Sequence, residues 1–366
     1  MSENHGEPIP AGQAAPQDEL TLRFDAGFDL GRITQLLQQA RERGGPTPET
    51  VCTLNLVAIY FTAAQYERAR EALEAAGAVH PCRLIALVGD PLIDTDSLTA
   101  RVSVVRSGGA ISVERVVLMA TGSAVRHLES AMMGLLIPEV PMVVVWGGRP
   151  EGDLLQRAVE SADRIITDSG ARPPTYLAEQ ARLLAGGAPL GDLAWARIFP
   201  WQSLAAECLD LPNLREHRGN VKSARVVCAG ALGAEGLLLA GWMASRVKRL
   251  QVSVEVQGDA ADFDSESTVT TGIPSGISSA IPRAAPMGLG HVALLEFQAP
   301  PATFTLRRAK GLLIAEVKGD DDGEVVHRIR LPPESPGRLL GLELKLLSGV
   351  DELYAASVQA ATRLLP

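Results

Sequence analysis

The sequence lacks the cysteine and histidine spacings that bind metals or build disulfide frameworks. Its four cysteines, Cys52, Cys82, Cys208 and Cys228, include no C-x-x-C pair, and its six histidines are isolated from one another. Scattered cysteines indicate a reducing compartment rather than a secreted, disulfide-stabilised protein. We therefore expect a cytoplasmic protein without a metal site.

Basic residues are also in the minority. The chain has 34 Lys and Arg against 43 Asp and Glu, which gives a formal net charge of -9. This balance disfavours phosphate backbones and anionic lipids, so neither nucleic acid nor a membrane is expected as a partner. Residues 1–20 contain neither the basic start nor the apolar core of a secretion signal, and we expect them to form a disordered tail.

Only one apolar run, residues 226–244, approaches the length of a membrane span. Glu235 lies in the middle of this run, where a carboxylate would cost about 2.5–3.5 kcal/mol in a bilayer. Glycines also divide the run into shorter pieces. We therefore predict a buried strand, a turn and a helix of a soluble domain.

With 366 residues, 46% of them apolar, the chain is long enough for about two domains. Strand-like and helical periodicities alternate along residues 21–215, which predicts an N-terminal α/β layered domain. Residues 216–366 show a strand, a turn and a helix, then consecutive strands and two closing helices. This order predicts a C-terminal α+β domain with an antiparallel meander. Residues 258–290 are small, polar and interrupted by proline, and we expect a mobile insertion there.

The sequence contains no recognisable catalytic motif, and no catalytic residue is assigned. Gly230, Gly233 and Gly236 form a turn between a predicted strand and helix, where a helix N-terminus could hold a phosphate. Their G-x-x-G-x-x-G spacing differs from the dinucleotide fingerprint, and Glu235 would repel an anion. A tight structural turn is the favoured interpretation, with a nucleotide site as the alternative.

Asp168 and Ser169 end the predicted strand "RIITDS". Ligands often gather at the carboxyl ends of parallel strands, so these side chains are candidates for a binding site. Short polar residues also cap helices and stabilise turns, which is the favoured interpretation here.

Two of the four tryptophans, Trp195 and Trp201, lie on either side of Pro200 in "DLAWARIFPWQSLAAECLD", residues 192–210. The alternation in "DLAWARI" predicts a strand, and the segment from Phe199 predicts an amphipathic helix. The tryptophans would then lie at a sharp junction between two elements. Core packing and anchoring at a protein interface both remain open, with core packing favoured.

The same segment, "DLAWARIFPWQSL", resembles the D-L-x-W-x-R-x-x-P-W signature of the glucose-6-phosphate dehydrogenase assembly proteins, the OpcA family. Further blocks, such as "LLIPEVPMVVVWGG" and "ADRIITDS", resemble that family in the family's order, and the C-terminal segment resembles its tail. The chain departs from the family at Gly147, where a second tryptophan is usual, and at Gln202, where an arginine is usual.

This resemblance implies a non-enzymatic protein that binds glucose-6-phosphate dehydrogenase, favours its active oligomer and supports the oxidative pentose phosphate pathway. The cofactor NADP would belong to the partner, so none is expected here. An α/β enzyme or sensor for a phosphorylated metabolite or nucleotide is the competing hypothesis. On the resemblance, the candidate partner-binding residues are Trp195, Arg197, Pro200 and Trp201, together with Trp146, Asp168 and Ser169 at the same end of the sheet.

Two details of this hypothesis concern individual side chains. Arg197 could pair with a carboxylate of the dehydrogenase, because a guanidinium suits bidentate pairing. For the tryptophans, one open arrangement places Trp195 in the core and leaves Trp201 the more exposed.

Overall fold

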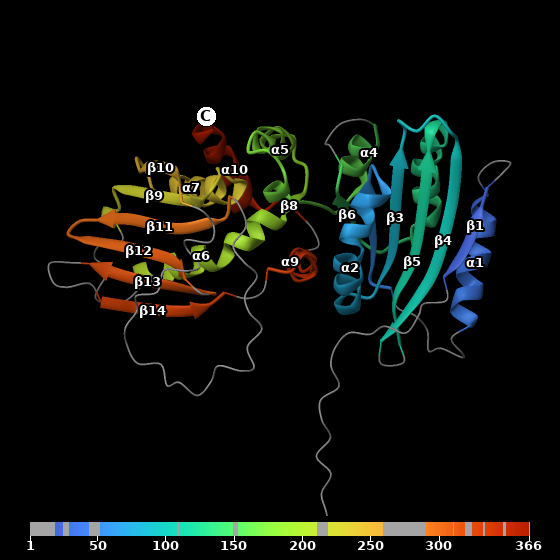
Figure 1. Ribbon diagram of the computed structural model, residues 1–366, viewed down its shortest axis with the longest axis horizontal. Coiled ribbons are helices and arrows are strands. Elements are labelled where there is room, and N and C mark those ends of the chain that lie inside the picture. The colour runs from blue at the N-terminus through green and yellow to red at the C-terminus, as the bar shows by residue number, and fades with distance from the viewer. Residues whose placement is uncertain are drawn as a thin grey trace, which may run out of the picture.

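The computed structural model consists of two β-sheets that lie side by side along the long axis, with helices around and between them (Figure 1). This architecture confirms the predicted α/β fold class. The structure describes residues 19–24, 29–43, 52–107, 110–148, 153–210, 219–258, 290–309, 311–318, 324–331, 334–346 and 349–365.

The first sheet has eight strands in the order β1-β4-β5-β3-β2-β6-β7-β8. Neighbouring strands from β5 to β8 in this order are parallel, whereas β4 is antiparallel to β5 and β1 is antiparallel to β4. Every residue of the central strand β2 is buried, as expected for a strand covered on both faces. The strands are β1 (Leu20–Arg23), β2 (Leu54–Tyr60), β3 (Cys82–Asp90), β4 (Ser97–Ser107), β5 (Ala110–Thr121), β6 (Met142–Trp146), β7 (Arg164–Thr167) and β8 (Leu190–Asp192).

Helices cover both faces of this sheet. α1 (Leu30–Glu42), α3 (His127–Leu135) and α5 (Tyr176–Ala185) bury apolar residues in one core cluster, and α2 (Ala63–Val79) does so in the other. α4 (Asp153–Ser161) connects β6 to β7. The chain leaves β2 through α2 to β3 on one side, and it later returns through α3 to β6 on the other side. The carboxyl ends of β2 and β6 therefore mark a topological switch point, where α/β sheets commonly bind ligands.

The second sheet has the strand order β10-β9-β11-β12-β13-β14. The strands β9 and β10 are parallel and joined by α7, and the four strands from β11 to β14 pair antiparallel in chain order, which confirms the predicted meander. The elements are β9 (Ser223–Ala229), α7 (Ala234–Arg246), β10 (Gln251–Gln257), β11 (Val292–Ala299), β12 (Ala302–Ala309), β13 (Leu312–Lys318) and β14 (Glu324–Arg330).

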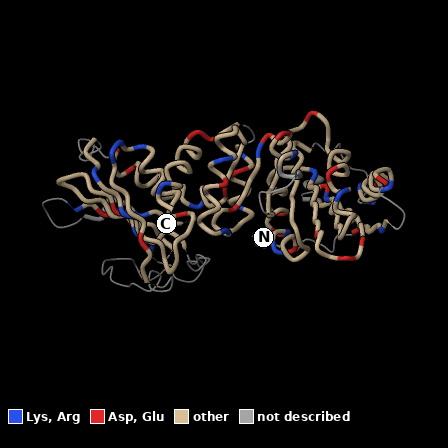
Figure 2. The backbone as a smooth tube through the Cα atoms, turned by 90° about the horizontal axis from the view of Figure 1, so that it is seen from above, with Lys and Arg blue, Asp and Glu red and all other residues tan. Residues whose placement is uncertain are grey.

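The apolar run at 226–244 forms the end of β9, a turn and most of α7, as the sequence predicts. Across the described parts of the chain, no helix is both long and apolar enough to cross a membrane. Acidic and basic positions are interspersed along the molecule (Figure 2).

The prediction of a strand at 192–198 followed by a helix from Phe199 is wrong. The strand β8 ends at Asp192, and the helix α6 (Leu193–Asp210) continues through Pro200. Buried positions recur along α6 with helical spacing on both sides of the proline, from Trp195 to Cys208. Seven residues of alternation fit about two turns of a buried helix as well as a strand. Burial on both sides of Pro200 offsets the helical hydrogen bond that is lost because proline has no N–H.

α6 packs against α7, β12 and β13 of the second sheet, and also against α9 (Pro336–Glu343). α9 in turn packs on α2 of the first sheet, and α10 (Glu352–Ala361) packs on both α5 and α7. The C-terminal helices therefore connect the two sheets.

Some predictions concern residues outside the described ranges. These are residues 1–18 of the expected tail, nearly all of the expected insertion at 258–290, and the predicted domain division at 215. Leu20, which was assigned to the tail, is the first residue of β1.

Candidate functional site at the junction of the sheets

Asp192, at the end of β8, organises the junction between the two sheets. Its fully buried carboxylate accepts hydrogen bonds at Oδ1 from the backbone N–H groups of Ser169 (3.0 Å) and Ala194 (2.9 Å). At Oδ2 it accepts hydrogen bonds from Gln180 Nε2 (3.1 Å) and from the Tyr354 hydroxyl (3.0 Å). A single carboxylate thereby connects the end of β7 to α5, α6 and α10, and it caps the start of α6.

Asp168, the residue after β7, is held by Arg197 of α6. The guanidinium donates from Nη1 to Oδ1 at 2.8 Å and from Nη2 to Oδ2 at 2.7 Å, and Nη1 lies 3.5 Å from Glu235 Oε1. Burial lowers the pKa of Arg197, but the hydrogen bond to Asp168 and the surrounding acidic charges outweigh burial, so the pKa is raised. The pKa of Asp192 is also raised, first by burial and then by the charge of Asp168.

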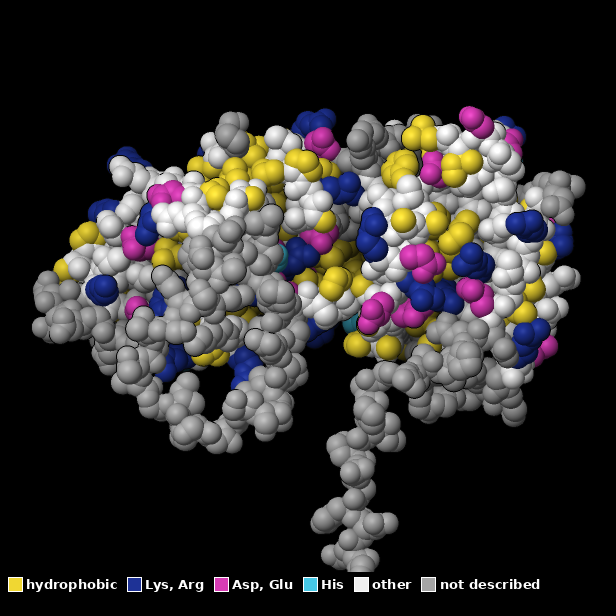
Figure 3. Space-filling model, viewed as in Figure 1, with side chains coloured by type: hydrophobic (Ala, Val, Ile, Leu, Met, Phe, Trp, Pro, Cys, Tyr) yellow, Lys and Arg dark blue, Asp and Glu magenta, His cyan; other side chains and the backbone are white. Residues whose placement is uncertain are grey.

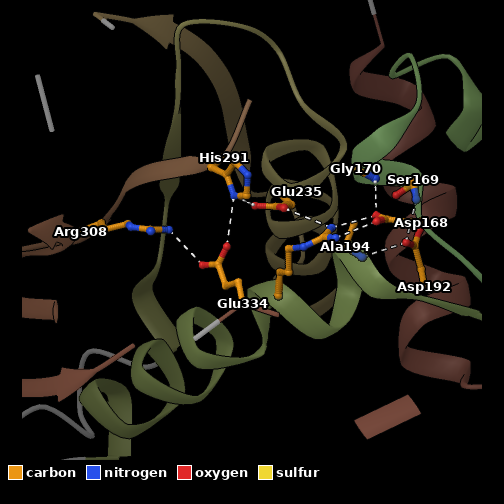
Figure 4. A network of polar contacts seen from close by, with 10 residues as sticks. Asp168, Ser169, Gly170, Asp192, Ala194, Glu235, His291, Arg308 and Glu334 are labelled. Atoms are coloured by element: carbon orange, nitrogen blue, oxygen red, sulfur yellow. Dashed lines mark hydrogen bonds and ion pairs between the residues drawn. The ribbon is translucent and has the colours of Figure 1, made fainter. Parts of the chain in front are cut away.

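Glu235, in the first turn of α7, continues these contacts into the second sheet. His291 Nδ1 lies 3.1 Å from Glu235 Oε2 and 3.5 Å from Glu334 Oε2, and Arg308 Nη1 donates to Glu334 Oε1 at 3.0 Å. The pKa of His291 is raised, first by its hydrogen bond to Glu235 and then by the two acidic charges, against burial. We call this chain of contacts the inter-sheet network (Figure 4); it comprises Asp168, Arg197, Glu235, His291, Glu334 and Arg308.

Close packing explains why glycines form the turn before α7. A Cβ on Gly233 would lie 2.1 Å from the carbonyl oxygen of Gly290, and a Cβ on Gly236 would lie 2.2 Å from the sulfur of Cys228. Glu235 fills the first turn of the helix with a carboxylate that is already paired. These contacts favour the structural interpretation of the turn over a phosphate site.

The three tryptophans among the candidate residues are buried. Trp195 is 8% exposed, donates from Nε1 to Asp351 Oδ2 at 3.2 Å and lies 5.5 Å from the ring of Tyr354. Trp201 is 4% exposed and Trp146 is 3% exposed. The arrangement with Trp201 as the more exposed side chain is therefore wrong, because Trp201 belongs to the buried residues of α6.

The other candidates are placed at the same junction. Ser169 is fully buried in the turn after β7, and Pro200 is partly buried on α6. Arg197, expected to pair with a dehydrogenase carboxylate, pairs with Asp168 and Glu235 of its own chain. Whether any of the candidate residues binds a partner stays a prediction.

Phe199 was missed as a candidate. It lies on α6 between the two buried tryptophans, and its side chain is 63% exposed. Helical spacing alone gives no clear signal for it, because residues four apart, such as Trp195 and Phe199, lie on nearly the same face of a helix. Because residues 192–198 were interpreted as a strand, Phe199 was not considered as part of a helix that continues through Pro200.

A cavity of about 380 Å³ lies at the carboxyl ends of β2, β6 and β7, beneath α2 and α9. It brings together the predicted residues Trp146 and Asp168, but it does not include Trp195 or Trp201. The space-filling view shows hydrophobic side chains in the hollow between the two lobes, with Lys or Arg side chains at its margins (Figure 3). The further lining residues are Tyr60, Gln65, Arg68, Ala69, Ala72, Leu73, Val145, Gly147, Ile166, Thr167, Ala171, Arg172, Leu193, Pro336 and Leu340.

The described residues contain no group of three His, Cys, Asp or Glu side chains that could hold a metal ion. All four cysteines are free, and burial raises the pKa of Cys52, Cys208 and Cys228 to about 11.

Two family models match consecutive parts of this chain. The N-terminal domain of the glucose-6-phosphate dehydrogenase subunit matches residues 73–183, and the C-terminal domain of the same subunit matches residues 188–358. Together the two matches cover most of the chain. The chain belongs to this glucose-6-phosphate dehydrogenase subunit (OpcA) family. The matches meet just before β8, so α6 and the second sheet lie in the C-terminal match.

Curated relatives agree with this assignment. The OxPP cycle protein OpcA of Synechocystis is 30% identical over 191 residues, and its namesake from Nostoc punctiforme is 30% identical over 196 residues. These alignments cover 49–50% of this chain and 40–41% of the relatives.

Solved structures are similar to this chain only in part. A 3-ketoreductase from Actinomadura kijaniata has a TM-score of 0.43 at 12% identity, covering 84% of this chain and 95% of the other. A Gal80p mutant from Saccharomyces cerevisiae has a TM-score of 0.43 at 9% identity, covering 85% of this chain and 94% of the other. Similarity this low carries no argument about activity.

Proposed function

We propose that this chain binds glucose-6-phosphate dehydrogenase and raises its activity by favouring the active, assembled form of that enzyme. The observation that carries this proposal is the pair of consecutive matches to domains named for a subunit of that dehydrogenase. The chain would act in the cytoplasm as a non-enzymatic partner, and would thereby support the oxidative pentose phosphate pathway.

The junction between the sheets supports a structural rather than a catalytic role. Arg197 is paired with two carboxylates from different elements, and Asp192 accepts four hydrogen bonds. Groups that satisfy one another in this way hold the sheets in a defined orientation. A general acid or base instead needs to reach a reacting atom of a substrate.

We propose that α6 contributes to the surface that meets the dehydrogenase. Trp195, Arg197 and Trp201 would position this helix from within, and Phe199 would contact the partner directly. Exposed aromatic side chains are common anchors at protein interfaces. Activation then follows from differential affinity, because a protein that binds the active conformer more tightly shifts the population toward it.

The test is a steady-state assay of glucose-6-phosphate dehydrogenase from the same source, titrated with this chain at fixed NADP while glucose 6-phosphate is varied. We expect saturable activation and no dehydrogenase activity from this chain alone. An unchanged rate, together with separate elution of the two proteins, would refute the proposed function.

A variant tests the proposed surface separately. Phe199→Ser should weaken the apparent affinity at least about tenfold, because burying a phenylalanine stabilises a complex by roughly 1.5–3 kcal/mol. Leu92→Ser is the matched control, since Leu92 is 90% exposed and lies outside α6. Equal affinities for the two variants would place the interface elsewhere without affecting the proposed function.

A further inference from the structure

The cavity at the carboxyl ends of β2, β6 and β7 has a position and a lining that fit a ligand. The chain leaves β2 toward β3 and leaves β6 toward β7 on the opposite side, so the carboxyl ends of these two adjacent strands leave a crevice at the switch point. α2 covers the crevice from the first sheet, and α9 covers it from the C-terminal part of the chain.

Most of the wall is apolar. Leu73 and Ala69 of α2 face this space together with Leu340 of α9, and Ile166 and Leu193 line it from the side of the sheet. Such a wall favours a hydrocarbon or ring-shaped body over a fully hydroxylated one. The volume of about 380 Å³ lies near the lower end of the range for ligand pockets, roughly 300–1,000 Å³, and favours a small molecule over a dinucleotide.

Two arginines supply positive charge at the cavity. Arg68 of α2 is exposed, and the described part of the chain provides no ion pair for it. Arg172 donates from Nη2 to the carbonyl oxygens of Gly147 and Gly148, both at 2.6 Å, which leaves its other N–H groups for a ligand. The acidic residue at the cavity, Asp168, is neutralised by Arg197. An anionic group would therefore meet two cations and little repulsion.

The loop after β2 argues against a Rossmann-type nucleotide mode. Thr62 and Gln65 form a capping box at the start of α2, so side chains satisfy the N–H groups that a pyrophosphate would otherwise bind. This loop also lacks glycine. The cations of the cavity, rather than a helix N-terminus, would hold the anion.

We propose that this cavity binds a small organic anion with an apolar or ring-shaped body, its acid group held by Arg68 and Arg172. The ligand would lie between α2 and α9 and would stabilise the packing of α9 on the first sheet. This inference does not depend on the proposed function, because the site lies within one chain.

The test is a fluorescence titration of the full chain with 1-anilinonaphthalene-8-sulfonate, an aromatic anion of suitable chemistry. We expect saturable binding that Ala69→Phe abolishes, because a phenyl ring from α2 would fill the cavity. Ala64→Phe is the matched control, since Ala64 is an exposed residue of the same helix that does not line the cavity. The proposal would be overturned if the dye showed no saturable binding, or if the two variants bound it equally well.

A second pair of variants tests the charge without changing the packing. Arg68→Gln should weaken dye affinity roughly three- to tenfold, the effect of losing one partly solvated charge-assisted contact. Arg70→Gln should leave the affinity unchanged, because Arg70 is exposed on the same helix and outside the cavity. Equal effects of the two substitutions would overturn the assignment of the anion to Arg68.

Displacement of the dye then identifies the acid group. Adenosine 5′-monophosphate offers a phosphate and phenylpyruvate offers a carboxylate, and displacement by either one supports the site and assigns its class. Adenosine is the uncharged counterpart of the first probe. Displacement by adenosine as effective as by its monophosphate would overturn the requirement for an anion.

Discussion

Arg164 and Glu343 form a buried ion pair that joins β7 to α9, and its removal gives a sharp prediction. The guanidinium donates to Glu343 Oε2 from Nη2 at 2.6 Å and from Nε at 3.2 Å, with the side chains only 1% and 4% exposed. Gly191 lies directly against the pair, since a Cβ on it would be 2.3 Å from Glu343 Oε2. Water therefore has little room to replace a missing partner.

Glu343→Leu should lower the free energy of unfolding by about 3–5 kcal/mol, because it leaves Arg164 charged and buried without its counterion. Burial raises the pKa of Glu343 and the charge of Arg164 lowers it, with burial the larger effect. Desolvation of the pair is therefore costly. The double variant Arg164→Met/Glu343→Leu, which removes both charges, should recover most of the loss and could exceed the wild type.

Urea denaturation followed by tryptophan fluorescence and circular dichroism would measure these differences. The exposed pair Glu67–Arg70, at 3.3 Å and about half exposed, provides the control. Arg70→Gln should change the free energy of unfolding by less than about 1 kcal/mol. The reasoning fails if Glu343→Leu costs no more than Arg70→Gln, or if the double variant is less stable than the single one.

Two further predictions concern pH and backbone packing. Because the pKa of His291 is raised above its ordinary 6.5 in the folded chain, the stabilisation it provides is fully present below pH 6.5 and is lost as the pH rises through the folded value. The stability difference between wild type and His291→Gln should therefore shrink with rising pH in urea titrations; a constant difference would contradict this. Gly241→Ala should destabilise by about 1–3 kcal/mol, since its Cβ would lie 2.2 Å from the backbone oxygen of Ser357, whereas Gly341→Ala on α9 meets nothing within 4 Å and should be neutral or stabilising by up to about 1 kcal/mol. Thermal and urea midpoints of this pair measure the contrast, and equal losses would show that the close approach of α7 to α10 is not the cause.

Local sequence patterns, such as capping residues and hydrophobic periodicity, predict the helices and strands whose formation depends on residues close to one another in the chain. The amphipathic helix from Leu30 to Glu42 begins after Asp29, whose side chain accepts a hydrogen bond from Gly31 N as a capping residue should. The meander strand β12 alternates buried and less buried residues over most of its length, as expected where the two faces of a sheet differ in packing.

The α6 segment shows where such local reasoning fails. Alternation over a few residues does not distinguish a strand from a buried helix, and Pro200, which lies inside α6, suggested a junction between two elements. The environment of Trp195 depends on Asp351 and on Tyr354 of α10, which lie far along the chain. The periodicity of the segment therefore could not predict which residues surround this tryptophan.

The sequence by itself determined the strands, most helices, the meander and the family resemblance, because hydrophobic period and capping act over a few residues. Only the tertiary structure decided that Asp168, a candidate in the sequence, and Glu235, next to the glycine turn, both pair with Arg197. It also decided that Arg68 and Arg172 line one cavity. These residues meet because parallel strands place their carboxyl ends at one edge and α6 joins the two sheets, and no local pattern encodes how two sheets pack.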